Sequence, residues 1–111
     1  QSIRKPGQRR LRRQLRELSH PTKVKLTPTG DNETTTLTII ANDRPGLLAV
    51  IGKMFIDLSL HVRSARIATL GERVEDTFLI QNQDGQPIAI GEATYTLQET
   101  MRQRLDTALR A

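Results

Sequence analysis

The sequence contains no cysteine, no tryptophan and only three other aromatic residues in 111 positions. Without cysteine, disulfide bridges and thiolate metal sites are excluded, and a reducing compartment is compatible with the chain. Sheets that read single-stranded RNA stack its bases on exposed aromatic side chains. Phe55 is expected on a helix, Phe78 in a core and Tyr95 before a helix, so the sequence argues against RNA binding.

Long apolar runs are missing as well. No stretch approaches the roughly 18 apolar residues that a membrane span needs, and the chain does not open with a signal-peptide pattern. We therefore expect no membrane partner and a cytoplasmic location. The length suits one domain with a modest core. The first residue is Gln1 rather than Met, which leads us to expect a piece of a longer protein.

Basic residues are unevenly distributed along the chain. Residues 1–25 contain nine Lys/Arg and one acid, a net charge of +8, whereas residues 26–111 contain eight Lys/Arg and eleven acids, a net charge of −3. A nucleic-acid-binding domain carries its basic face on the fold itself, so we expect no nucleic-acid partner. We divide the chain into a basic linker or end of a preceding domain at 1–20 and a folded domain at 21–111. The leucines of 9–18 have helical spacing, which predicts a short basic helix that serves as linker or, alternatively, contacts phosphate or an acidic partner.

The stretch LTIIANDRPGLL carries the strongest local signal. An apolar strand runs into a polar corner, and Pro45-Gly46 then starts a second apolar run. Proline suits the first turn of a helix because its missing N–H would have no partner there, and Asp43 is then the preferred N-cap. Glycine in that turn leaves the amides of Gly46 and Leu47 open to a small anion. The corner at 42–47 is therefore the predicted binding place for a small molecule.

Hydrophobic periodicity predicts the order of the elements. Alternating apolar residues indicate strands, and apolar residues spaced three and four apart indicate helices. Val62 is out of phase with Ala65, which predicts a bulge near Arg63. Thr96 and Glu99 are expected to form a capping box at the start of the last helix. The predicted elements are strands at about 24–28, 34–42, 61–70 and 73–82 and helices at about 45–58 and 97–110.

From residue 37 onward the predicted order is strand, helix, strand, strand, helix. With the motif ANDRPGLL at 41–48 and the run VRSARIAT at 62–69, this order resembles the ACT domain, a small-molecule regulatory module. The resemblance implies an α+β, ferredoxin-like fold with an antiparallel four-stranded sheet and two helices on one face. The stretch LGERVEDTFLI at 70–80 is similar to the last ACT domain of bifunctional uridylyltransferase/uridylyl-removing enzymes, which modify the nitrogen-regulatory protein PII.

One departure from the ACT pattern concerns the fourth strand. The usual domain ends with a strand after its second helix, whereas this sequence stops at Ala111 as the helix finishes. In the ACT fold the fourth strand lies antiparallel beside the first. Residues 24–28 are joined to the strand at 34–42 by a short loop and could occupy that place. We therefore expect 24–28 to form an edge strand hydrogen-bonded to the first ACT strand.

Residues suited to catalysis are sparse. The two histidines, His20 and His61, have no cysteine or clustered acids beside them, and no serine–base pair, Gly-rich phosphate loop or metal-ligand spacing is present. Asp43, Glu75 and Asp76 could be grouped as carboxylates, but we interpret them as a helix cap and solvated charges. We expect no catalytic residue, metal or cofactor in this stretch. The catalytic residues of a parent enzyme would lie outside it.

An amino acid is the ligand that suits the corner. Its carboxylate would meet the amides of Gly46 and Leu47, and its ammonium would meet Asn42 and Asp43. Its side chain would extend toward the strand that follows the first helix. The resemblance implies L-glutamine as the effector, a signal of nitrogen sufficiency, and PII as a partner through the parent enzyme. The predicted ligand-binding residues are Asn42, Asp43, Arg44, Gly46, Leu47, Arg63, Ser64 and Arg66.

Two alternatives stay open. In one, the corner is only a well-capped connection and the domain is a pure dimerisation module, because Thr36, Thr38, Ser64 and Arg66 leave a sheet face or edge open for pairing. In the other, the domain regulates a different amino-acid-controlled enzyme. Ligand sites of ACT domains usually form between paired copies. The resemblance therefore implies a homodimer or pairing with a neighbouring ACT domain.

Overall fold

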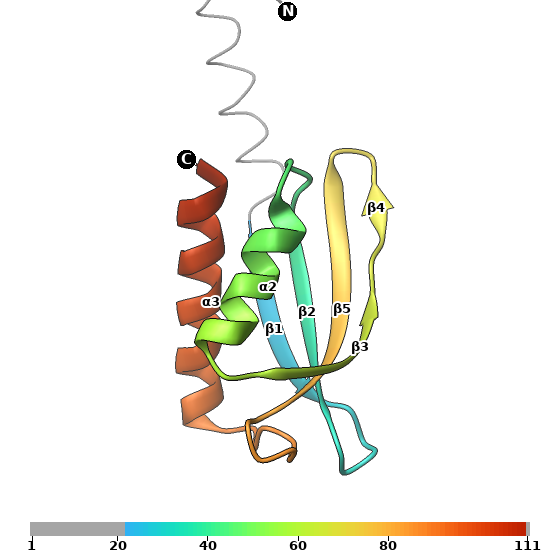
Figure 1. Cartoon of the computed structure of the whole chain (residues 1–111), viewed down its shortest axis with the longest axis vertical. Helices are drawn as coiled ribbons and strands as arrows, with labels where there is room; N and C mark the ends of the chain where they lie inside the picture. The colour runs from blue at the N-terminus through green and yellow to red at the C-terminus, as the bar shows by residue number, and fades with distance from the viewer. Residues whose placement is uncertain (1–21, 111) are drawn as a thin grey trace, which may run out of the picture.

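The computed structural model describes residues 22–110 of the chain. They form one antiparallel sheet, and both helices pack against the same face of it (Figure 1). No helix in this part of the chain is long and apolar enough to cross a membrane. In chain order the elements are β1 (Lys23–Pro28), β2 (Thr35–Asn42), α2 (Leu47–Asp57), β3 (His61–Arg66), β4 (Thr69–Leu70), β5 (Arg73–Gln81) and α3 (Glu92–Arg110).

The strand order in the sheet is β1-β2-β5-β3, and the short β4 pairs with the beginning of β5. The prediction for residues 24–28 is confirmed, since β1 is an edge strand that pairs antiparallel with β2 and places Leu26 opposite Leu37. β1 thus occupies the position beside β2 that was predicted for it. The α+β class is confirmed, and the order is consistent with the ferredoxin-like arrangement that the resemblance implies.

The core lies between the sheet and the two helices. Along β2 and β5, buried residues alternate with half-buried ones, as the sequence periodicity predicts. Phe55 of α2 meets Phe78 of β5 edge to face, with ring centroids 5.1 Å apart. The buried apolar residues are Leu26, Leu37, Ile39, Ala41, Leu47, Ile51, Met54, Phe55, Val74, Phe78, Ile80, Met101, Leu105 and Leu109.

The strand predicted at 61–70 is broken into β3 and β4. The bulge expected near Arg63 is confirmed by a register shift between Val62 and Ser64. The break falls at residues 67–68, where the Ala68 N–H donates to the Asp76 carboxylate (3.2 Å) instead of to a neighbouring strand. A side chain that accepts a backbone hydrogen bond interrupts the regular ladder, and periodicity alone does not reveal it.

The last helix begins earlier than predicted. α3 starts at Glu92, and the Thr94 hydroxyl accepts a hydrogen bond from the Gly91 N–H (2.6 Å) at its first turn. Thr96 therefore lies inside the helix, and the predicted capping box with Glu99 is wrong. Glu99 instead pairs with Arg102 one turn later. The predictions for the linker at 1–20 and for a basic helix at 9–18 lie outside the described residues.

Candidate ligand-binding corner

The connection between β2 and α2 forms a corner near the turn that joins β4 to β5 (Figure 1). The Leu47 N–H donates to the Arg44 carbonyl (3.1 Å) and closes a turn, after which α2 begins. Gly46 is the N-cap, with a left-handed φ of 81°, and no side chain caps the helix. The prediction that Asp43 is the N-cap is therefore wrong. Glycine adopts positive φ at little cost, which places Pro45 in the turn before the helix.

The first turn of α2 has unpaired amides, but the Leu47 amide, which was predicted to be open, is not among them. The first helical hydrogen bond runs from the Val50 N–H to the Gly46 carbonyl (3.1 Å). The N–H groups of Leu48 and Ala49 precede that bond and have no partner inside the helix. The amide of Leu47 is occupied by the turn, contrary to the expectation that it would meet a carboxylate. The anion-attracting end of α2 is therefore centred one residue later than predicted.

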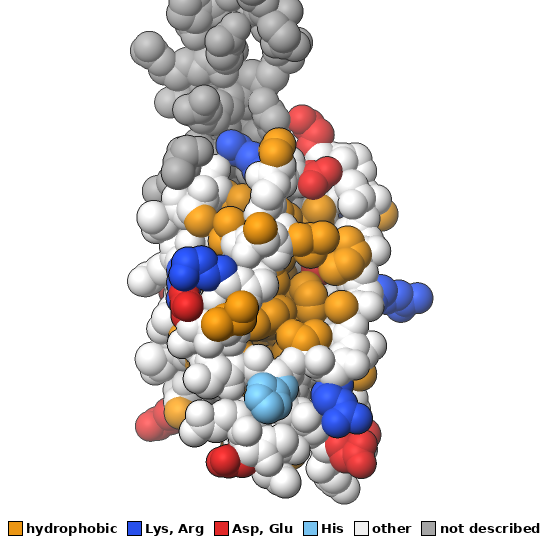
Figure 2. All heavy atoms as spheres, viewed as in Figure 1, with side chains coloured by type: hydrophobic (Ala, Val, Ile, Leu, Met, Phe, Trp, Pro, Cys, Tyr) orange, Lys and Arg blue, Asp and Glu red, His pale blue; other side chains and the backbone are white. Residues whose placement is uncertain are grey.

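A hollow lies in front of this helix end, between the start of α2, the β3–β4 connection and β5. Its volume of about 230 Å³ is below the roughly 300–1,000 Å³ of pockets that hold drug-sized ligands, so it suits a smaller molecule. Hydrophobic side chains gather around this part of the surface (Figure 2). The lining residues are Asp43, Arg44, Gly46, Leu47, Leu48, Ala49, Ile67, Thr69, Val74 and Asp76.

Asp76 is the functional candidate that the sequence reasoning missed. We interpreted it as a solvated charge, whereas its side chain is only 1% exposed and lines the hollow. Burial raises the pKa of Asp76 above its ordinary value, a hydrogen bond from the Ala68 amide opposes this rise, and the negative charge of Asp43 adds to it. The available signal was the alternation itself, which places Asp76 on the buried face of β5 between Val74 and Phe78.

The hollow carries charges of both signs. Asp43 and Asp76 supply carboxylates, and Arg44 supplies a guanidinium beside the positive end of α2. Within residues 22–110, no hydrogen bond or ion pair engages the side chain of Asp43 or Arg44. The backbone N–H of Asp43 donates to the Glu72 carbonyl (2.8 Å), which holds the corner against the β4–β5 turn. The arrangement is suited to a small zwitterion.

Four of the predicted ligand-binding residues line the hollow, and four do not. Asp43, Arg44, Gly46 and Leu47 are among its lining residues. Asn42 is not, because it alternates with buried Ala41 and so lies on the sheet face away from the helices. The remaining three, Arg63, Ser64 and Arg66, are exposed on β3 and contribute nothing to the lining.

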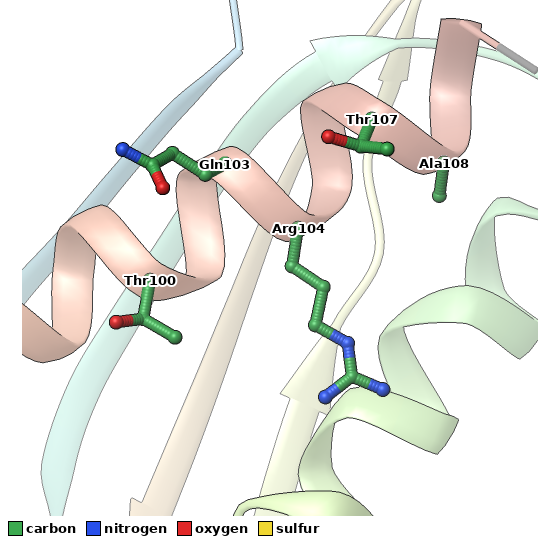
Figure 3. Close-up of a pocket in the computed structure, with 5 residues that line it drawn as sticks. All are labelled: Thr100, Gln103, Arg104, Thr107 and Ala108. Atoms are coloured by element: carbon green, nitrogen blue, oxygen red, sulfur yellow. The ribbon is translucent and has the colours of Figure 1, made fainter.

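A second hollow lies along α3 (Figure 3). All of its lining residues come from that single helix: Thr100, Gln103, Arg104, Thr107 and Ala108. The Arg104 guanidinium is engaged in an ion pair with Asp57 of α2. The buried polar side-chain atoms without a partner belong to other parts of the described chain, and those residues do not line this hollow. The described residues that line the α3 hollow thus include no buried polar atom without a partner, in contrast to the corner.

Metal binding has no support in the described part of the chain. Between residues 22 and 110, no three His, Cys, Asp or Glu side chains lie close enough together to hold a metal ion. Asp43 and Asp76 form only a pair of carboxylates, and no third ligand accompanies them.

Comparison with known proteins identifies the enzymes to which this chain is related. It is 45% identical over 98 residues to the bifunctional uridylyltransferase/uridylyl-removing enzyme of Pseudomonas putida (strain W619). It is 44% identical to the enzyme of the same name from Stutzerimonas stutzeri (strain A1501), and 43% identical to that of Pseudomonas fluorescens (strain SBW25). The chain is thus homologous to a segment of about 100 residues in these enzymes.

Each of these alignments covers 88% of this chain but only 11% of the relative. The chain therefore spans about a ninth of the length of the curated relatives that it matches. No protein-family model matches the sequence. No solved structure matches it significantly either.

Proposed function

We propose that the chain is an amino-acid-sensing regulatory domain of the ACT type, part of a larger uridylyltransferase/uridylyl-removing enzyme, with L-glutamine as its effector. The homology to a segment of such enzymes supports the choice of parent. The strand order and the two helices on one face are consistent with the ACT type. The catalytic activities of the parent, and its action on PII, belong to segments other than this one.

One observation carries the sensing proposal. The hollow at the corner brings the free first-turn amides of Leu48 and Ala49 together with the unpaired side chains of Asp43 and Arg44. The amides and the guanidinium favour a carboxylate, and the acidic wall favours an ammonium. An α-amino acid carries both groups on one carbon. The choice of glutamine among amino acids comes from the resemblance to the nitrogen-regulatory enzymes.

A ligand in this hollow would touch three elements at once, and this contact supplies a regulatory signal. The hollow is lined by the start of α2, by Ile67 and Thr69 of the β3–β4 region, and by Val74 and Asp76 of β5. A bound amino acid would hold these segments in one arrangement. A bound amino acid changes the activity of the parent enzyme only if the arrangement that it stabilises makes different contacts with the rest of the parent chain.

Thermal unfolding in the presence of amino acids tests the proposal. A ligand at about 10 mM with a Kd of about 0.1 mM adds about 2.7 kcal/mol to the free energy of unfolding. For a domain of this size each kcal/mol raises the midpoint by roughly 4–8 °C, so the shift is measurable. L-Glutamate and D-glutamine serve as ligand controls. Absence of any shift with L-glutamine, or an equal shift with all three compounds, would contradict glutamine sensing.

A blocking variant localises the effect. Ala49→Glu places a carboxylate at the first turn of α2, where it competes with the ligand for the free amides but remains compatible with the helix. Ile56→Glu is the matched control, because Ile56 is 77% exposed on the same helix and does not line the hollow. Gly46 is a poor target, since its φ of 81° makes any side chain there strained. We expect Ala49→Glu alone to abolish the glutamine-induced shift.

A second candidate function, pairing of domains, is favoured by the β3 edge. All six residues of β3 are exposed, and nearby apolar side chains on the same side of the molecule are at least two-fifths exposed: Leu48, Val62, Ile67 and Leu70. We propose that a second copy or a neighbouring ACT domain covers this edge. Val62→Lys should weaken self-association in sedimentation experiments, whereas Thr27→Lys on β1 should not. A single 12.5 kDa species at high concentration would contradict pairing between copies.

A further inference from the structure

Asp76 carries a buried oxygen that the protein leaves without a partner. The side chain is 1% exposed, and its Oδ1 accepts one hydrogen bond from the Ala68 N–H (3.2 Å). The other oxygen, Oδ2, is buried and has no hydrogen-bond partner. Buried polar groups are nearly always paired, and an unpaired carboxylate oxygen is costly, so this atom requires an explanation.

The possible partners inside the described chain do not supply the missing bond. Arg44 lines the same hollow, yet its guanidinium forms no ion pair with Asp76. The charge of Asp43 acts on Asp76, and it is of the same sign. No third acidic, histidine or cysteine side chain in residues 22–110 completes a metal site with these two. A ligand that carries a donor would supply the missing bond.

We propose that Oδ2 of Asp76 accepts the α-ammonium of the amino-acid ligand and that Asp76 is the residue that selects for an amine. This inference rests on the proposed function and names the group that recognises the ligand's positive end. It replaces Asn42, which lies on the other face of the sheet. A charge-assisted N–H···O bond from an ammonium would satisfy the unpaired oxygen and offset the cost of its burial.

The two charged ends of the zwitterion have separate partners in this arrangement. With the ammonium at Asp76, the α-carboxylate faces the free amides of Leu48 and Ala49 at the end of α2. Oδ2 has no contact with solvent in the unliganded structure, so the ligand reaches it only when a rim side chain moves aside. Leu48 and Ile67 line the hollow and are 54% and 46% exposed, so they are free to do so. The ligand's own side chain is left to point toward solvent or a paired domain.

Calorimetric titration of three proteins with two ligands tests this assignment. The proteins are the wild type, Asp76→Asn and the matched control Glu75→Gln, whose carboxylate lies on the opposite face of β5 and pairs with Arg73 (2.8 Å). The ligands are L-glutamine and glutaramate, which is the same molecule without the α-ammonium. We expect L-glutamine to bind Asp76→Asn at least about tenfold more weakly than wild type, because the variant loses a charge-assisted hydrogen bond to the ligand. Glu75→Gln should bind like wild type.

The glutaramate arm separates recognition of the amine from a structural role of Asp76. Wild type should bind glutaramate at least about tenfold more weakly than L-glutamine, and Asp76→Asn should not weaken glutaramate binding further. Equal affinity of wild type for the two ligands, or equal affinity of wild type and Asp76→Asn for L-glutamine, overturns the assignment and leaves the proposed function standing. If wild type binds no amino acid, both the assignment of Asp76 and the proposed function are contradicted. The glutaramate comparison needs only wild type, so it decides the question even if Asp76→Asn does not fold.

Discussion

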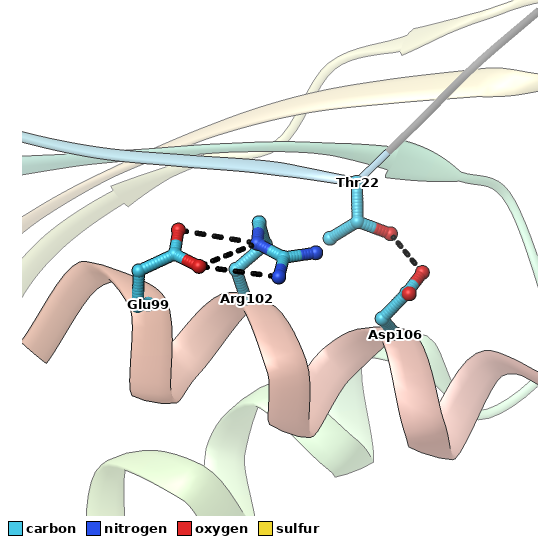
Figure 4. Close-up of polar contacts among 4 residues, drawn as sticks. All are labelled: Thr22, Glu99, Arg102 and Asp106. Carbon is cyan, nitrogen blue, oxygen red and sulfur yellow. Dashed lines mark hydrogen bonds and ion pairs between the residues drawn. The ribbon is translucent and has the colours of Figure 1, made fainter.

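The two edges of the sheet differ in how the rest of the chain covers them. At the β1 edge, α3 lies alongside, the Leu26 N–H donates to the Gln98 side chain (2.8 Å), and the Thr22 hydroxyl donates to Asp106 (3.2 Å) (Figure 4). At the β3 edge every residue is exposed, and a bulge interrupts the pairing with β5. The first edge is closed by side chains of a helix, and the second is open.

This difference separates an edge that the fold itself covers from an edge that is open for recognition, while the core takes side chains from both β2 and β5. The Leu26 amide, which is bonded by the Gln98 side chain, is not offered to another strand, so the β1 edge is protected against pairing at this point. The hollow and its unpaired carboxylate lie on the β3 side, between α2, the β3–β4 connection and β5. We call these two parts the covered side (β1, β2 and α3) and the open side (the start of α2, β3, β4 and β5).

The largest expected effect contrasts one substitution on the two sides. Leu105→Ala on α3 removes a fully buried side chain and should lower the free energy of unfolding by about 2–5 kcal/mol. Leu70→Ala on β4 removes a side chain that is 52% exposed and should change it by no more than about 0.5 kcal/mol. Urea denaturation measures both. Similar losses at the two positions would contradict the difference in burial between them.

Removing the side chain that bonds the β1 edge comes next. Gln98→Ala leaves the N–H of buried Leu26 without its acceptor and should cost about 1–3 kcal/mol in urea denaturation. Gln103→Ala is the control, because Gln103 lies on the same helix, is exposed and makes no hydrogen bond to β1 in the described structure. If the two variants are equally stable, Gln98 does not protect the edge.

On the open side, Asp76→Asn should stabilise the unliganded protein. Burial raises the pKa of Asp76, so the folded state disfavours the charged carboxylate that is present at neutral pH. The charged carboxylate therefore costs free energy in the folded state, and we expect Asp76→Asn to raise the free energy of unfolding at pH 7. Urea denaturation at several pH values measures the gain.

The pH dependence of that gain has a fixed sign. Wild type loses no stability at Asp76 below pH 3.8, the ordinary pKa, because the carboxyl is protonated in both folded and unfolded states. The loss develops as the pH rises from there through the raised folded pKa. Asp31 and Asp57, whose pKa values are lowered, are present in both proteins and cancel in the comparison. An advantage of Asp76→Asn that grows toward acid pH would contradict the account.

The smallest expected effect comes from Gly52 in the middle of α2. A Cβ added there meets no atom within 4 Å, so no close packing requires glycine. Gly52→Ala should therefore raise the free energy of unfolding by about 0.5–1 kcal/mol through helix propensity alone, measured by urea denaturation. Because Gly52 does not line the hollow, glutamine binding should be unchanged. A loss of stability would show that this position is packed more tightly than the structure indicates.

Patterns that depend on local periodicity could be predicted from the sequence. Leu37, Ile39 and Ala41 alternate with polar or half-buried residues, and all three lie in the core. The edge strand at 24–28 was also predictable, because its alternation and the short loop to β2 leave it few other neighbours. These features follow from side-chain spacing and chain connectivity, which a single sequence contains.

The features that were missed depend on competition for backbone hydrogen bonds and on backbone conformation, which apolar periodicity does not encode. The cap of α2 was misplaced because Gly46 adopts a positive φ and displaces Asp43 from the cap position. The start of α3 was misplaced because Thr94 bonds Gly91, which no capping-box pattern indicates. Asp76 was predicted to be solvated because a charged side chain usually faces solvent, even where the alternation of the strand places it on the buried face. Here the carboxylate is buried and accepts a bond from Ala68, whose position depends on the break between β3 and β4.

The most direct test of the account is a map of backbone amide chemical shifts in the 15N-labelled chain during titration with L-glutamine. The account predicts that the largest changes fall on the open side, at residues 43–49, 67–69 and 74–76, where the lining of the hollow lies. The amides of β1, and those of α3 around the hollow in Figure 3, should stay in place. Changes concentrated on the covered side, or no changes at saturating glutamine, would contradict the proposal that the corner is the sensor.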